Sequence, residues 1–305
     1  MSVAPQSPDE VRSVVVIGNL RSRKTSAMYS KTIEALIARG VSIVESHTVS
    51  DGGELAKRVK NAVADEHEYV LVAGGDGSMT SIVGEFAHRK SVLGVLPLGT
   101  GNSFAQSLGM EPTIESAVET IVSGRVERVD LGMVNGRHFA NFATIGLSST
   151  IARGTPNLVK KYLGPFAYVV SGIAPLMRSS SFEATVKWNK SDVKVRTHQL
   201  IVASGRYFGF TPILPDATIV DGELSLFTTS GCSRWDVARM FVAFHRGRQT
   251  TLADAEYFSA AEIDVEAKPK QYLDVDGEAF GKTPAHFSID SKALRVLVPR
   301  DFTGK

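Results

Sequence analysis

The first 130 residues alternate between short, uninterrupted apolar runs and longer segments in which apolar residues recur every three or four positions. The short runs predict strands that are buried on both faces, and the recurring spacing predicts amphipathic helices. Regular alternation of the two predicts a parallel, doubly wound sheet, whose ligands bind outside the carboxyl ends of its strands. The predicted strands are residues 14–17, 41–44, 69–73 and 92–97, and the predicted helices are residues 26–39, 54–66, 79–83 and 114–122.

The pattern changes at about residue 126, beyond which strand-like runs dominate. The pairs Asn135-Gly136, Asp221-Gly222 and Asp276-Gly277 are typical of tight turns between antiparallel strands. We therefore expect a mostly antiparallel region that two helices interrupt. The predicted strands are residues 126–134, 138–145, 182–188, 193–204, 224–228, 263–265, 271–275, 287–289 and 293–298, and the two helices lie near residues 157–177 and 233–246.

Two glycine-rich turns follow the third and fourth predicted strands, Gly74-Gly75-Asp76-Gly77-Ser78 and Gly99-Thr100-Gly101-Asn102-Ser103. Glycine allows the backbone to approach a phosphate closely, and the helix N-terminus that follows the first turn attracts anions. Asp76 places a carboxylate where it can hold Mg²⁺ or a nucleotide hydroxyl, and Asn102 occupies the matching position. Each turn alone is also typical of an ordinary connection between strand and helix, but the pair favours a nucleotide phosphate as ligand. The loop at 18–24 is expected at the same edge of the sheet.

The size of the chain allows two domains. It has 305 residues, of which 43% are hydrophobic and 22% are charged. We expect an N-terminal α/β nucleotide-binding domain with a doubly wound sheet at residues 1–130, followed by a larger antiparallel β-sandwich-like domain at residues 131–290. The strand predicted within about 291–305 either returns to the first domain or stays with the second.

The composition disfavours several partners and sites. A net charge of +2 lacks the basic footprint of a nucleic-acid-binding protein. Cys232 is the only cysteine, which excludes an intramolecular disulfide and a cysteine-based zinc cluster and fits a cytoplasmic protein. The longest apolar stretch, residues 166–177, is too short to span a bilayer, so we expect any membrane contact to be peripheral.

Motifs spread along the chain stand at residues 74–78, 98–109, 129–132, 141–146, 161–172, 214–223 and 274–278. In this order they resemble the diacylglycerol kinase catalytic-domain family, which includes sphingosine kinases and bacterial lipid kinases. The likeness covers nearly the whole chain. NAD kinases and phosphofructokinases are similar only around residues 74–77, and the Asn-Glu pair with which NAD kinases hold their substrate occurs nowhere in this sequence.

The resemblance implies a kinase that binds ATP with Mg²⁺ and phosphorylates the hydroxyl of a diacylglycerol-like lipid. By position, the first glycine turn would contact the ATP phosphates, and the second would also face the nucleotide. The loop after the first strand departs from the family's Asn-Pro-x-Ser-Gly pattern, since Leu20 and Arg23 replace the proline and the glycine. The implied nucleotide-binding residues are Asn19, Ser22, Gly74, Gly75, Asp76, Gly77, Ser78, Gly99, Thr100 and Asn102.

Acidic residues of the second domain carry the remaining implied roles. Asp276 would be the general base that accepts the hydroxyl proton, with Glu278 in support. Without the resemblance, the same residues equally fit a hairpin turn with solvated acids. Asp216 and Asp221 would hold a structural Mg²⁺, and a simple turn is again the alternative. Asp130 either joins the electrostatic network around the active site or caps a hinge by satisfying its backbone hydrogen bonds.

The expected partners are ATP and a lipid with a free hydroxyl. Peripheral membrane contact is expected. The helix near 157–177, which has basic residues at its ends, either provides this contact or is a helix packed on the core. We expect no nucleic acid, and the sequence leaves a homodimer open. The expected location is cytoplasmic with peripheral membrane association.

Two departures from the family pattern keep alternatives open. Ser103 stands where the family often has an aspartate, and Ser148 replaces another frequent acid. The missing acid near the lipid site favours a neutral diacylglycerol-type head over a sphingoid ammonium. The alternatives are a kinase of a soluble alcohol such as NAD, and a non-catalytic regulator that binds a nucleotide or a lipid.

Overall fold

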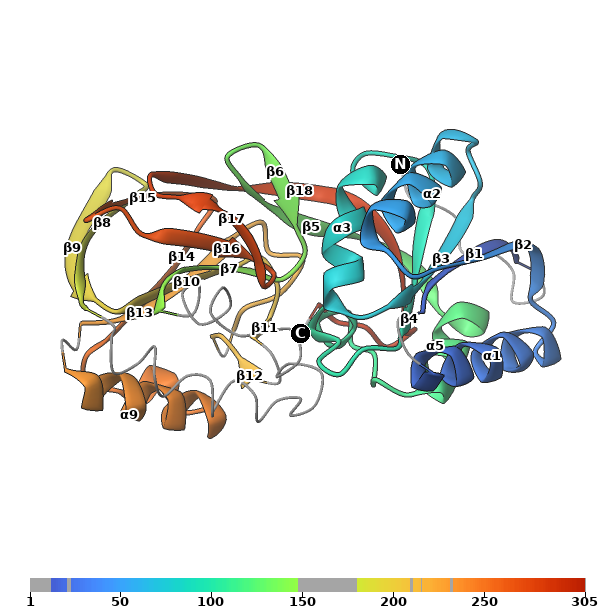
Figure 1. Cartoon of the computed structure of the whole chain (residues 1–305), viewed down its shortest axis with the longest axis horizontal. Helices are drawn as coiled ribbons and strands as arrows, with labels where there is room; N and C mark the ends of the chain where they lie inside the picture. The colour runs from blue at the N-terminus through green and yellow to red at the C-terminus, as the bar shows by residue number, and fades with distance from the viewer. Residues whose placement is uncertain are drawn as a thin grey trace. The chain divides into compact units, whose positions relative to one another are not determined.

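The structure is a computed structural model of the chain, and it describes residues 12–20, 23–147, 180–208, 211–214, 216–230 and 233–304 (Figure 1). The chain divides into two units. Unit 1 consists of the chain up to Val129 together with Lys292–Gly304, and unit 2 consists of Asp130–Ser291. The long strands β5 (Arg125–Val134) and β18 (Ala285–Val298) contribute residues to both units.

Unit 1 contains a parallel sheet covered by helices. Its elements are β1 (Ser13–Asn19), α1 (Arg23–Ala38), β2 (Ser42–Val49), α2 (Gly52–Ala64), β3 (Tyr69–Gly74), α3 (Asp76–Phe86), β4 (Val92–Pro97), α4 (Ser103–Ser107) and α5 (Ile114–Ser123). The strand order is β2-β1-β3-β4, and the C-terminal part of β18 pairs with β4 in parallel. Every residue of β3 and β4 is buried, as expected for strands with helices on both faces. Figure 1 shows α1 and α5 on one face and α2 and α3 on the other.

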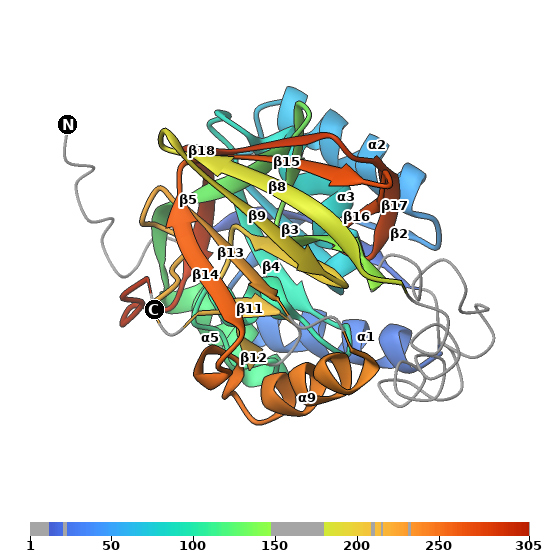
Figure 2. The same ribbon diagram turned by 90° about the vertical axis from the view of Figure 1, so that its left-hand side faces the viewer.

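Unit 2 is built mainly from antiparallel strands. Its elements besides β5 and β18 are β6 (Arg137–Phe139), β7 (Phe142–Gly146), β8 (Phe182–Trp188), β9 (Ser191–Thr197), β10 (Gln199–Ala203), β11 (Tyr207–Phe208), β12 (Thr211–Pro212), β13 (Leu224–Thr229), α9 (Arg234–His245), the 3₁₀ helix η1 (Gln249–Thr251), β14 (Ala255–Ala260), β15 (Glu262–Lys268), β16 (Tyr272–Val275) and β17 (Glu278–Lys282). One sheet has the order β9-β8-β15-β18, and the second has the order β14-β13-β10-β7-β16-β17. Figure 2 shows β9, β8 and β15 side by side.

The two sheets of unit 2 enclose an apolar core. Strand β15 alternates exposed and buried residues along its whole length, which is the pattern of a strand with one face in a core. Phe182, Leu226 and Phe287 are among the buried residues of this core. On the other face of the second sheet, α9 packs into a separate cluster that includes Phe227 and Phe244, whose rings meet edge to face at 4.9 Å.

The predicted fold class is confirmed, an α/β domain with a parallel sheet followed by an antiparallel sandwich. The predicted strand 138–145 is wrong, because it is two strands separated at Ala140 and Asn141. Likewise, residues 193–204 divide into β9 and β10 at His198, whereas the last two predicted strands are the single strand β18.

The turn predictions have mixed outcomes. Asn135-Gly136 and Asp276-Gly277 connect hairpins, and all four residues have positive φ, as the tight turns of hairpins require. Asp221-Gly222 is no hairpin turn, since it leads into β13, whose partners are β10 and β14. The helix predicted near 157–177 lies outside the described residues. In the described part of the chain, no helix is both long and apolar enough to cross a membrane.

Candidate functional site

The two glycine turns of unit 1 lie against each other at the carboxyl ends of β3 and β4. The Leu98 N–H donates a hydrogen bond of 2.9 Å to the Gly74 carbonyl. A Cβ atom added at Gly99 would stand 2.6 Å from the Gly75 Cα atom, closer than real Cβ contacts allow. The two backbones can approach this closely only because both residues are glycine.

Asp76 ties the first turn to the second. Its Oδ1 atom accepts a hydrogen bond of 3.2 Å from the Phe104 N–H, and the N–H groups of Asn102 and Ser103 also stabilise the carboxylate. Burial nevertheless raises the pKa of Asp76 above its ordinary value, because the loss of hydration outweighs these donors. Asp76 therefore has a positioning role in the turns besides any contact with a ligand.

Asn102 shapes the second turn from within. It is 4% exposed and adopts a left-handed conformation with φ of 52°. Its Oδ1 atom accepts a hydrogen bond from the Gly99 N–H at 2.9 Å, and its Nδ2 atom donates to the Gly99 carbonyl at 3.0 Å. The side-chain amide is thus bound to the turn itself, while Gly99 and Thr100 are exposed.

Asn19 joins the same edge of the sheet from β1. Its Nδ2 atom donates a hydrogen bond of 3.0 Å to Ser78 Oγ, and its buried Oδ1 atom has no hydrogen-bond partner among the described residues. A Cβ atom at Gly74 would stand 2.5 Å from Ser78 Oγ, so this glycine makes room for Ser78. Helix α3 begins just there, and its N-cap Gly75 provides no side-chain hydrogen bond to the first turn. The structure therefore gathers the predicted residues of unit 1, except Ser22, which lies outside the described residues.

Asp276 forms part of a second polar site, in unit 2. Its carboxylate accepts hydrogen bonds from three successive N–H groups, with Oδ2 bound to Ala140 at 3.0 Å and Oδ1 bound to Asn141 and Phe142 at 3.0 and 2.9 Å. The Asp276 N–H donates to the Phe142 carbonyl at 2.8 Å. The residue is thus both a hairpin turn residue and a carboxylate in a fixed orientation. These bonds also explain why the predicted strand 138–145 is interrupted.

Asn141 was not among the residues singled out from the sequence. Its side chain is 1% exposed, and neither its Nδ2 nor its Oδ1 atom has a hydrogen-bond partner among the described residues. Its backbone is held, because its N–H donates to Asp276 and its carbonyl accepts from the Ser204 N–H at 3.0 Å. A buried amide without partners is costly and suits a ligand that supplies them. The only sequence signal was its place in one of the family motifs.

The neighbouring acids of this hairpin differ in environment. Glu278 is exposed and forms an ion pair of 3.3 Å with Arg137, which is also exposed. Asp274 is 2% exposed and lies two residues before Asp276 on β16. Because side chains alternate along a strand, position 274 is on the face of the sheet opposite to the core residues Leu273 and Val275.

The residues predicted to hold a structural Mg²⁺ do not form a cage in the described part of the chain. Asp221 Oδ2 accepts the Thr218 N–H at 3.1 Å, and Oδ1 accepts the Glu223 N–H at 3.0 Å, while Asp216 is exposed. Among the described residues, no group of three or more His, Cys, Asp or Glu side chains could hold a metal ion. The carboxylate of Asp221 is engaged in shaping its turn, so the magnesium site stays a prediction.

Asp130 is bound to the loop that contains Asp221. It is 2% exposed, its Oδ2 atom accepts the Gly222 N–H at 2.8 Å, and its own N–H donates to the Ile219 carbonyl at 2.9 Å. These bonds fit the structural alternative for Asp130, in which its side chain satisfies the hydrogen-bonding groups of a neighbouring backbone segment.

Two domain families match the chain. Residues 13–134 match the diacylglycerol kinase catalytic domain. Residues 142–298 match the YegS C-terminal NAD kinase beta sandwich-like domain.

Curated proteins and solved structures agree with these matches. The chain is 27% identical to a diacylglycerol kinase of Staphylococcus epidermidis, over 82% of this chain and 80% of the relative. It is 28% identical to a diacylglycerol kinase of Staphylococcus saprophyticus, over 82% of this chain and 83% of the relative. A crystal structure of a diacylglycerol kinase from Bacillus anthracis matches the fold with a TM-score of 0.72 at 19% sequence identity. The match covers 96% of this chain and 98% of the Bacillus chain. That likeness shows the fold.

Proposed function

We propose, from the premise that this chain belongs to the diacylglycerol kinase catalytic-domain family, that it transfers the γ-phosphate of ATP to the free hydroxyl of a diacylglycerol-like lipid. Unit 1 would hold the nucleotide, and unit 2 would supply the groups that act on the hydroxyl. Phosphoryl transfer asks the protein mainly for positioning and for stabilisation of charge, with a carboxylate to accept the hydroxyl proton.

The joined glycine turns support the nucleotide half of the proposal. The backbone N–H groups at the start of α3 and the positive end of its dipole would bind phosphate oxygens, and Thr100 would add a hydroxyl from the second turn. Asp76 is a hard oxygen donor of the kind that Mg²⁺ prefers, so it would hold the ion that accompanies ATP. When bound, Mg²⁺ would offset the negative charge of the phosphates.

The pairing of Asp276 with Asn141 is the observation that carries the acceptor half. The three N–H groups from residues 140–142 fix the direction of the Asp276 carboxylate, as a general base requires. The buried Asn141 amide would bind the acceptor oxygen and turn the hydroxyl toward Asp276.

A neutral diacylglycerol-type head is favoured over the alternatives. The names of the curated relatives point to diacylglycerol as their substrate. The missing Asn-Glu pair speaks against NAD as the acceptor. A non-catalytic regulator would have no need of a general base, which is the role that we propose for Asp276.

The test is transfer of labelled γ-phosphate from ATP, with Mg²⁺, to diacylglycerol, monoacylglycerol, sphingosine, ceramide and NAD. A short-chain diacylglycerol that disperses in water belongs in the panel, because its phosphorylation does not depend on membrane binding. We expect transfer to diacylglycerol in both forms. Transfer to NAD alone would overturn the lipid assignment, and ATP binding without any transfer would support the regulator.

Asp276→Asn tests the general base. We expect transfer to fall by about 10²–10⁴-fold while ATP affinity stays unchanged. Asp51→Asn is the matched control, since that carboxylate also accepts two backbone N–H groups, at the start of α2, and has no predicted role at either site; it should leave transfer nearly unchanged. Thermal unfolding of both variants separates loss of the base from loss of the fold. Equal losses of activity in the two variants would contradict the role of Asp276.

A further inference from the structure

Helix α9 of unit 2 presents exposed apolar and basic side chains on its outer side. Trp235 is 84% exposed, more than any other large hydrophobic side chain of the described residues, and Val242 is 50% exposed. Positions 235, 239, 242 and 246 lie within about 60° of one another around an α-helix. We call Trp235, Arg239, Val242 and Arg246 the Trp235 stripe.

We propose that the Trp235 stripe docks on the surface of an anionic phospholipid bilayer. The inference rests on the proposed function, because a kinase whose acceptor lipid stays in the bilayer has to work at the membrane surface. The indole ring favours the boundary between headgroups and acyl chains, where its apolar body is buried and its N–H stays hydrated. A helix with apolar and basic residues on one side can lie in the plane of that boundary.

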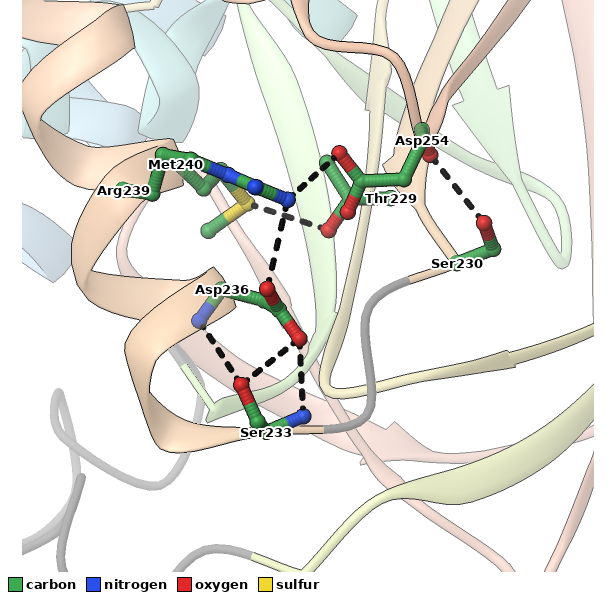
Figure 3. A network of polar contacts seen from close by, with 7 residues as sticks. All are labelled: Thr229, Ser230, Ser233, Asp236, Arg239, Met240 and Asp254. Carbon is green, nitrogen blue, oxygen red and sulfur yellow. Dashed lines mark hydrogen bonds and ion pairs between the residues drawn. The ribbon is translucent and has the colours of Figure 1, made fainter.

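The polar contacts around α9 fix the helix that carries Trp235 (Figure 3). Ser233 and Asp236 form a capping box, with the Asp236 N–H donating to Ser233 Oγ at 3.2 Å and the Ser233 N–H donating to Asp236 Oδ2 at 3.0 Å. Arg239 Nη2 lies 3.2 Å from Asp236 Oδ1 and 2.9 Å from Asp254 Oδ1. The start of the helix is thus anchored within unit 2, and Trp235 is displayed by an ordered element.

The inner side of the same helix is occupied by the core. Val237, Met240 and Phe244 are buried, and the Thr229 hydroxyl donates a hydrogen bond to Met240 Sδ at 3.8 Å. Rotation of α9 to bury Trp235 would therefore expose these residues. The exposed position of Trp235 is therefore a fixed feature of the described part of unit 2.

The charge near the stripe points to an anionic partner. Asp236 and Asp254 both pair with Arg239, so these three groups together carry one net negative charge, and the cations that could face a bilayer lie at the other end of the helix. Arg246 and Arg248 are exposed, and neither forms an ion pair with any described residue. Each basic residue close to an anionic leaflet adds about 1 kcal/mol of attraction, or about five-fold in binding. A symmetric dimer through the stripe would instead bring these cations toward their own copies.

Binding of the full chain to vesicles tests the proposal without any measurement of activity. The chain has two tryptophans, so Trp188→Phe leaves Trp235 as the only indole. Trp188 stacks on the Phe258 ring at 3.9 Å, and phenylalanine keeps this aromatic contact. With vesicles of phosphatidylcholine and phosphatidylglycerol, we expect the Trp235 emission to shift to the blue and to be quenched by brominated lipid. Vesicles of phosphatidylcholine alone should give a much smaller effect.

Variants of the stripe and of the nearby Arg248 give the second readout. We expect Trp235→Gln to weaken vesicle binding about tenfold, and Arg246→Gln together with Arg248→Gln to weaken it by about 25-fold. The control with the same loss of charge is Lys190→Gln together with Lys270→Gln, both exposed and away from α9, and it should have a smaller effect. Phosphorylation of the dispersed short-chain lipid should be the same in all these variants.

The outcomes separate this inference from the proposed function. If the wild type binds vesicles through Trp235 but phosphorylates no lipid, the docking surface stands and the proposed function fails. If the short-chain lipid is phosphorylated but Trp235 shows no shift on anionic vesicles, the docking surface is overturned. A stripe variant that abolishes self-association in sedimentation and leaves vesicle binding intact would also overturn it, and would identify a second copy as the partner.

Discussion

Gly77→Ala and Gly99→Ala form a matched pair that separates the structural demand for glycine from the demand of a ligand. Both residues lie in the glycine turns of unit 1. A Cβ atom at Gly99 would stand 2.6 Å from Gly75 Cα and 2.6 Å from Asn102 Oδ1, whereas a Cβ atom at Gly77 would meet nothing within 4 Å. The protein alone therefore forbids the methyl group at one position and accepts it at the other.

The magnitudes follow from these contacts. Because backbone cannot move aside as a flexible side chain does, Gly99→Ala must separate the turns, and we expect a loss of about 1–3 kcal/mol in the free energy of unfolding. Gly77 lies in α3 with an ordinary helical backbone, so Gly77→Ala should raise this free energy by about 0.4–1 kcal/mol. If phosphate oxygens approach the start of α3, the same methyl group should weaken ATP binding about tenfold, or by about 1.4 kcal/mol.

Urea unfolding followed by circular dichroism, together with calorimetric titration of ATP, measures both quantities. We expect the free energy of unfolding to fall in Gly99→Ala and to rise in Gly77→Ala, and we expect ATP binding to be weakened in both variants. Gly99→Ala with wild-type stability would refute the close packing of the turns. Gly77→Ala with raised stability and unchanged ATP affinity would show that no phosphate comes near α3, and would refute the assignment of the first glycine turn.

Two further changes test the polar groups of the sites. Burial raises the pKa of Asp76 above 3.8, so the stability that its protonated form contributes is present below pH 3.8 and is lost as the pH rises through the raised pKa. The melting temperature of Asp76→Asn should therefore rise relative to that of the wild type between about pH 4 and pH 7. A difference that stays constant with pH would contradict this. Asn141→Leu keeps the number and branching of the side-chain heavy atoms but removes the buried amide. We therefore expect the free energy of unfolding to stay level or to rise by up to about 1–3 kcal/mol, while kcat/KM for the lipid falls. A destabilised protein with full activity would contradict this.

Strands β3 and β4 of unit 1 were predictable because they are almost entirely apolar and are buried along their whole length. Strand β2 was predicted only at its start, because its second half is polar and mostly exposed. Asp276 shows a different relation between sequence and structure. A hairpin turn and a general base looked like alternatives for Asp276, but the turn is what directs the carboxylate at residues 140–142, so the two roles are compatible. A local pattern predicts the turn, whereas the three N–H donors come from a segment more than 130 residues earlier in the chain.

Two asparagines show what the sequence could not predict. Asn102 was expected to face the nucleotide, yet its left-handed backbone turns the amide onto Gly99, and its contact with a nucleotide stays a prediction. Asn141 carried no signal of its own, because an amide is a candidate for binding only after the fold has removed it from water and from protein partners. Both outcomes depend on tertiary contacts that spacing and composition do not record.

The serine at position 103 affects the charge around the Asp76 carboxylate. Where the family often has an acid, this chain has a serine that is 3% exposed and whose N–H helps to stabilise the Asp76 carboxylate. Asp76 therefore both joins the two turns and supplies the negative charge that a magnesium ion would need, without a second acid at position 103. A second carboxylate there would stand beside a group whose pKa burial already raises, and like charges would raise it further. The serine avoids this repulsion, so the Mg²⁺ contact that we propose at the two turns would rest on the Asp76 carboxylate.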